Sequence, residues 1–170
     1  MLDAITSLVD VHLVDREPVP RGGEPRFRLL PIVAAYGREL LEAAGEDEAV
    51  RERHARAYAA LARRVGRQAE TRVVEELRPD RADLHAALGF LVDHGEVAAG
   101  LRLAADIALL WMRGGFYPFQ RAWLDRLLAA AATASDVTPA ELGTAYLWRA
   151  LLAVETPAEY GLPEVARWLR

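Results

Sequence analysis

The segment 26–45 changes its hydrophobic period midway, and this change constrains the fold more than any other feature of the chain. Phe27 and Leu29 alternate with arginines as in a strand, and Pro31 follows where a first helical residue needs no N–H. Apolar residues then recur at helical spacing up to Gly45, a typical residue just past a helix C-terminus. The segment therefore predicts a strand that runs directly into an amphipathic helix.

The residues before this junction complete a small motif. Leu2, Ile5 and Leu8 form a helical stripe, and residues 12–16 alternate like a strand. The segment 17–25 is rich in proline and glycine, which favours a loop between two strands. Helix, strand, loop and strand in this order make the second half of a winged helix, with the loop as its wing.

After Gly45 the helical spacing of apolar residues predicts successive amphipathic helices joined by short loops. Alanine and leucine carry much of its 52% hydrophobic content, and both favour helix. The helices are expected over 47–67, 71–77, 81–94, 96–113, 116–132, 138–154 and 162–170. Because short loops make neighbouring helices antiparallel, we expect a mainly α protein built of antiparallel helix pairs.

We expect the apolar stripes of these helices to pack together in one core. Its predicted members are Leu84, Leu88, Leu91, Leu101, Ile107, Trp111, Trp123 and Leu127.

Composition excludes several classes of function. A net charge of −4 argues against nucleic-acid binding over a broad surface, and the absence of cysteine excludes disulfides and thiolate chemistry. The N-terminus lacks the positively charged region and the apolar region that follow one another in a signal peptide. The most apolar window, 101–112, is too short and too polar to span a bilayer. A cytoplasmic location is expected.

A weak internal repeat appears in the helical region. Leu142, Gly143 and Tyr146 match the L-G-x2-Y core of a tetratricopeptide (TPR) helix, and Gly100 lies in a weaker copy 43 residues upstream. The pattern favours a TPR-like right-handed superhelix preceded by the β-hairpin of a partial winged helix. A plain helical bundle is the alternative.

The order of four segments resembles a known arrangement. RFRLLPIVAAYGRELLEAAGE, RERHARAYAALARR, ADLHAALGFLVDHGEVAAGLRLAADIALLW and RAWLDRLLA follow one another along the chain. This order is similar to the region after the nucleotide-binding core of bacterial STAND-type ATPase regulators, which include LuxR-type and AfsR/SARP-type transcription factors. The resemblance implies a partial winged helix over 1–45 and a TPR-like helical array over 46–170. It also implies a non-catalytic relay between the ATPase core and a partner- or effector-binding array.

A nucleotide sensor of related ATPases cannot be transferred to this chain. Many of those proteins carry a Met-His-Asp triplet at the strand-to-helix junction, where this chain has Leu29, Leu30 and Pro31. A leucine cannot donate a hydrogen bond to phosphate. The chain also lacks the P-loop motif and has no lysine. We therefore expect no nucleotide, no other cofactor and no enzymatic activity.

The histidines suggest no metal site. His54 lies on an apolar helical stripe and is expected to be a hydrogen-bonded core residue. His85 and His94 have Asp83 and Asp93 nearby, but their angular positions on the helix differ and no i, i+4 histidine pair exists. A solvated face is the interpretation for this pair.

Contacts with other proteins are expected at the two ends of the chain. The candidate partner-contact residues are Leu2, Ile5, Leu8, Trp168 and Leu169. Their partners would be other domains of the same regulator or a second copy of the chain, and a small-molecule effector is also conceivable for the array. Two other functions stay open, namely a stand-alone TPR-like protein-binding scaffold and DNA binding through the winged-helix part. No contact with a membrane is expected.

Overall fold

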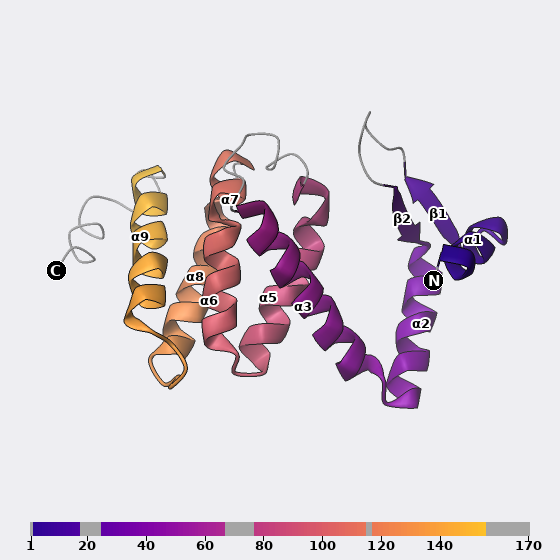
Figure 1. Cartoon of the computed structure of the whole chain (residues 1–170), viewed down its shortest axis with the longest axis horizontal. Coiled ribbons are helices and arrows are strands. Elements are labelled where there is room, and N and C mark those ends of the chain that lie inside the picture. The colour runs from indigo at the N-terminus through magenta and orange to yellow at the C-terminus, as the bar shows by residue number, and fades with distance from the viewer. Residues whose placement is uncertain (1, 18–24, 67–76, 115–116, 156–170) are drawn as a thin grey trace. The chain divides into compact units, whose positions relative to one another are not determined.

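The computed structural model describes residues 2–17, 25–66, 77–114 and 117–155. The described chain is mainly helical and contains a two-stranded antiparallel sheet (Figure 1). It divides into two compact units, an N-terminal unit of Met1–Val50 and a C-terminal unit of Arg51–Arg170. Among the described residues, no helix is long and apolar enough to cross a membrane.

The N-terminal unit contains the predicted hairpin. Its elements are α1 (Leu2–Asp10), β1 (Val14–Glu17), β2 (Arg26–Leu29) and α2 (Pro31–Ala44). The two strands pair antiparallel, with Val14 opposite Leu29 and Glu17 opposite Arg26. His12 has a positive φ of 57°, which ends α1 and turns the chain into β1.

Both predicted ends of α2 are confirmed. Pro31 occupies the first turn, directly after β2. Gly45 adopts the left-handed conformation with φ of 69°, and its N–H donates to the Glu42 carbonyl oxygen at 3.0 Å. Glycine adopts this conformation without the steric cost that a Cβ brings. The change of period seen in the sequence is therefore the junction between β2 and α2.

The C-terminal unit is helical throughout its described part. Its elements are α3 (Asp47–Gly66, of which the first turn belongs to the N-terminal unit), η1 (Arg78–Asp80), α5 (Arg81–Asp93), α6 (Val97–Asp106), α7 (Ala108–Gly114), α8 (Tyr117–Ala131) and α9 (Pro139–Glu155). The helix expected over 162–170 lies outside the described residues, as does most of the one expected over 71–77.

The single helix predicted over 96–113 is wrong, because the chain bends at Ile107. This residue has φ of −99° and ψ of 1°, and it separates α6 from α7. Hydrogen bonds still cross the bend, from the Ile107 N–H to the Leu103 carbonyl and from the Trp111 N–H to the Ile107 carbonyl. Ile107 and Trp111 are both fully buried. The apolar stripe therefore continues on both sides of the bend. The helical spacing of the apolar residues in the sequence could not show where the bend lies.

The core of the C-terminal unit contains all eight predicted residues, seven of them buried and Trp123 partly buried against the others. Helix α6 packs against α5, α7, α8 and α9. Gly100 permits one of these approaches, since a Cβ at this position would lie 2.6 Å from Cδ2 of Leu127 on α8.

Candidate functional site

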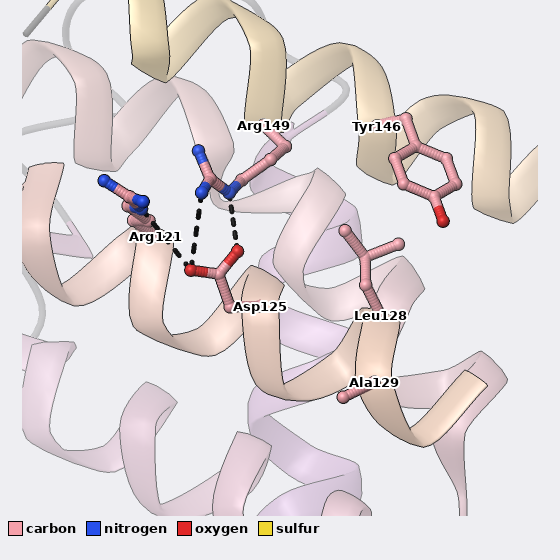
Figure 2. Close-up of a pocket in the computed structure, with 6 residues that line it drawn as sticks. All are labelled: Arg121, Asp125, Leu128, Ala129, Tyr146 and Arg149. Carbon is pink, nitrogen blue, oxygen red and sulfur yellow. Dashed lines mark hydrogen bonds and ion pairs between the residues drawn. The ribbon is translucent and has the colours of Figure 1, made fainter. Parts of the chain in front are cut away.

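An open groove lies between α8 and α9, with a volume of about 440 Å³ (Figure 2). Its lining consists of Arg121, Asp125, Leu128 and Ala129 from α8 and of Tyr146 and Arg149 from α9. The volume falls in the range of ~300–1,000 Å³ that ligand pockets occupy. We take this groove as the candidate site among the described residues.

Helical spacing explains how each lining side chain reaches the groove. Arg121, Asp125 and Ala129 recur at every fourth position of α8, which places them along one side of that helix. On α9, Arg149 stands in the buried stripe that also contains Ala145 and Leu152. The stripe faces α8, so the Arg149 side chain extends toward the carboxylate of Asp125 (Figure 2).

The charged end of the groove is an arginine–aspartate–arginine cluster. Nε of Arg149 donates to Oδ1 of Asp125 at 2.6 Å, and Nε of Arg121 donates to Oδ2 at 3.4 Å. Arg149 is only 3% exposed and the Asp125 side chain is 45% exposed, so the ion pair joins a buried guanidinium of α9 to an exposed carboxylate of α8. The three side chains carry a net charge of +1, because Asp125 is the one acidic residue in the lining.

The other end of the groove is apolar, with Tyr146 and Leu128 side by side in Figure 2. Among the six lining residues there is no histidine, serine or cysteine to act as nucleophile or general base. The arrangement offers a charged end and an apolar end to a bound side chain or anion.

The histidines are placed by neighbours that the sequence did not reveal. Nε2 of His54 lies 3.0 Å from Oδ1 of Asp83, and its ring packs on Tyr58. The expected hydrogen bond of His54 is thus confirmed, although the side chain is only partly buried.

The solvated face expected for His85 and His94 is wrong for His85 only, since His94 is exposed. His85 is half-buried between the indoles of Trp111 and Trp123, and this burial, together with Arg81, lowers the pKa of His85. His94 stacks on Phe90, whose carbonyl lies 2.7 Å from Nδ1. Within the described residues, no group of three or more potential ligands could hold a metal ion.

The predicted partner-contact residues fall partly outside the described chain. Trp168 and Leu169 lie outside it, and Leu2 begins α1 but its side chain is not described. Ile5 is half-buried and Leu8 is 38% exposed. Their role in partner contact stays a prediction.

A larger apolar surface of the N-terminal unit lies on α2. Ile32, Tyr36 and Leu40 are 76%, 60% and 52% exposed, and they recur at every fourth residue. No residue of α2 is buried. Leu29, Leu30 and Pro31 stand at the β2–α2 junction, as expected from the sequence.

Sequence reasoning missed the groove itself. The spacing of Arg121 and Asp125 was a signal for an i, i+4 ion pair on α8. An arginine at position 149, within an otherwise apolar stripe, was a signal that a carboxylate must face it. Which carboxylate it meets depends on how the two helices pack.

Comparisons with family models, with curated proteins and with solved structures find no match to this chain.

Proposed function

We propose that the chain is a non-catalytic regulatory segment of a STAND-type transcription regulator. In this role the N-terminal unit contacts a nucleotide-binding core, and a TPR-like helical array relays its state to a partner or effector. The observation that carries the proposal is the order of elements, in which a hairpin runs through the β2–α2 junction into a helical array.

The ion pairs of the C-terminal unit support an array of repeating helices. Arg56 of α3 bonds to Glu96, at the start of α6, at 2.7 Å, and Arg102 of α6 bonds to Glu141 of α9. These pairs are 40 and 39 residues apart. Since the backbone of Gly66 also approaches Asp106, α3 and α6 run parallel. The offset is longer than the ~34 residues of a TPR unit, so we propose a long-repeat relative of that array.

The exposed stripe on α2 supports a contact with another domain. A row of three large apolar side chains, Ile32, Tyr36 and Leu40, is a surface that a partner domain would cover. Because this row begins one residue after the β2–α2 junction, it lies next to the segment that approaches nucleotide in related ATPases. We therefore assign the α2 stripe as the contact with the ATPase core.

A first test is genetic. We expect the reading frame upstream of Met1 to encode a P-loop ATPase, and a frame that encodes an unrelated enzyme would contradict the proposal.

A second test uses the full-length regulator and a transcriptional reporter. Tyr36→Asp combined with Leu40→Asp should abolish or lock the nucleotide-dependent response, because two carboxylates would be buried against the core. Arg38→Ala combined with Glu42→Ala is the matched control on the same helix and should leave the response intact. Equal responses from both pairs would show that α2 has no such role.

The groove between α8 and α9 favours a second function, a stand-alone scaffold that binds a helix of another protein. Its charged end and apolar end match an amphipathic partner. Binding of a partner helix by the chain without any ATPase domain would favour this alternative.

A further inference from the structure

The elements of the N-terminal unit are each too small to be stable alone. Helix α1 has 9 residues and α2 has 14, and isolated helices of up to ~12–15 residues are only marginally stable in water. The hairpin joins two strands of 4 residues each, and a single two-stranded hairpin is also marginally stable at best. The stability of this unit must therefore come from contacts between its elements.

The contacts between these elements bury very little apolar surface. Val14 is the one buried side chain among those described in the N-terminal unit. Of the twelve large apolar side chains that are exposed in the described chain, eight belong to this unit. Arg28 and Glu17 form an ion pair across the hairpin, but the Arg28 side chain is 73% exposed, and exposed ion pairs contribute little to stability. The described part of the unit thus has no core of its own.

Other means of stabilising a small unit are also missing from the described residues. Natural units of this size usually depend on disulfides, on a structural metal or on a partner that completes their core. The chain has no cysteine, and within its described part no group of three or more potential ligands could hold a metal ion. A partner is the means that is left.

We propose that the N-terminal unit folds only while a partner covers its apolar surface, and that it is largely unfolded in the isolated chain. The identity of the partner rests on the proposed function, in which the nucleotide-binding core covers the α2 stripe of Ile32, Tyr36 and Leu40. Contact and folding are then one event, because the apolar surface buried by the partner offsets the conformational entropy that the chain loses. The C-terminal unit has a buried core and folds without this contact.

This inference deepens the proposed function, because it names what changes when the core and the segment meet. The first turn of α3 belongs to the N-terminal unit, and the Val50 N–H donates to the Glu46 carbonyl at 3.0 Å. Ordering of the N-terminal unit therefore also orders the start of the helix that continues into the C-terminal unit. The contact acts as a switch between an ordered and a disordered segment.

Hydrogen–deuterium exchange of the 170-residue chain tests the proposal directly. Peptides that cover α2 should exchange within about tenfold of the rate of an unstructured peptide, because opening there costs almost no free energy. Peptides that cover α6 should exchange at least about a thousandfold more slowly, since this helix opens only together with the core. Mass spectrometry of the peptides measures both rates. Equal protection of α2 and α6 would overturn the proposal.

Two core variants distinguish an unfolded unit from a folded unit with an exposed surface. Val14→Ala should change the exchange rate of α2 by less than about twofold, because there is no folded unit left to destabilise. Leu88→Ala is the matched variant in the core of the C-terminal unit and should speed the exchange of α6 at least about tenfold. If Val14→Ala speeds the exchange of α2 as strongly, the unit folds on its own and the proposal is wrong.

The same measurement on the full-length regulator identifies the partner. Protection of α2 should rise at least about a hundredfold over the isolated chain. Tyr36→Asp with Leu40→Asp should remove this gain, whereas Arg38→Ala with Glu42→Ala should keep it. Fast exchange of α2 in both proteins would contradict the contact with the ATPase core, while the unfolded unit of the isolated chain would stand. Protection that rises with the concentration of the isolated chain would overturn the core as partner in favour of a second copy.

Discussion

Helices α2 and α5 carry apolar stripes of the same helical period but differ in what covers them. On α5, Leu84, Leu88 and Leu91 are fully buried. On α2, none of the fourteen residues is buried, and Ile32 is 76% exposed. An apolar stripe therefore identifies a helix and the side of it that packs against another element. It does not show whether that element belongs to the same unit. In the C-terminal unit other helices of the same unit cover the stripe of α5, whereas in the N-terminal unit the stripe of α2 stays exposed.

The largest effect should come from the covered stripe. Leu88→Ala is expected to lower the free energy of unfolding by about 2–5 kcal/mol, through lost transfer energy and the cavity left behind. Leu88 is fully buried in the core of the C-terminal unit. Urea denaturation followed by far-UV circular dichroism measures this change.

Leu147→Ala is the control within the same unit, since Leu147 is 58% exposed on α9. We expect a loss of less than about 0.5 kcal/mol there, as for most exposed positions. Similar losses for both variants would break the contrast between covered and open surfaces.

Two glycines in α6 and α9 sharpen the comparison. Gly100→Ala should destabilise the chain by about 1–3 kcal/mol, because the new methyl group would meet the fully buried Leu127 at 2.6 Å. Gly143→Ala should stabilise it by about 0.5–1 kcal/mol, because alanine favours helix and nothing lies within 4 Å. Thermal unfolding gives both values, and equal signs would show that α6 is not tightly packed on α8.

The start of α9 predicts an effect of pH. The Thr138 hydroxyl accepts from the Glu141 N–H at 3.3 Å, while the Glu141 carboxylate accepts from the Thr138 N–H at 2.8 Å. The two bonds that the Glu141 carboxylate accepts from Thr138, from its N–H and from its hydroxyl, lower the pKa of Glu141 below its ordinary value of 4.5, with help from Arg102. Their stabilisation is therefore present above pH 4.5 and is lost as the pH falls through the lower, folded-state pKa.

Thr138→Ala should cost about 0.5–2 kcal/mol at pH 7, as for other N-cap residues. Denaturation curves at pH 7 and at pH 3 measure it. We expect the difference between Thr138→Ala and the parent chain to shrink at pH 3, and an unchanged difference would exclude a role for the Glu141 carboxylate.

Local signals in the sequence were sufficient to predict most elements of both units. Pro31 and Gly45 bound α2, and Thr138 with Pro139 opens α9, because each acts through the backbone of its own segment. The core residues were predictable because their periodic stripes are long. The bend at Ile107 was not, because hydrogen bonds continue across it and both flanking segments are apolar.

Contacts between helices far apart in the sequence could not be predicted in the same way. Arg149 and Asp125 are 24 residues apart, and His85 of α5 meets the indole of Trp111 of α7. Such pairs depend on how the helices pack. A single sequence shows which residues are charged but not which of them lie close together in the folded chain. The groove between α8 and α9 therefore became visible only with the fold.

The smallest effect should come from the open stripe of the N-terminal unit. Ile32→Gln combined with Leu40→Gln should change the unfolding free energy by less than about 0.5 kcal/mol, since both side chains are more than half exposed and glutamine suits a helix. Urea denaturation measures it beside Leu88→Ala. A loss above about 1.5 kcal/mol would mean that the stripe is covered within this chain, because mutational losses of that size need a buried site. A neutral result, together with a lost response of the Tyr36→Asp and Leu40→Asp variant in the proposed reporter test, would support a contact between α2 and a domain outside the N-terminal unit.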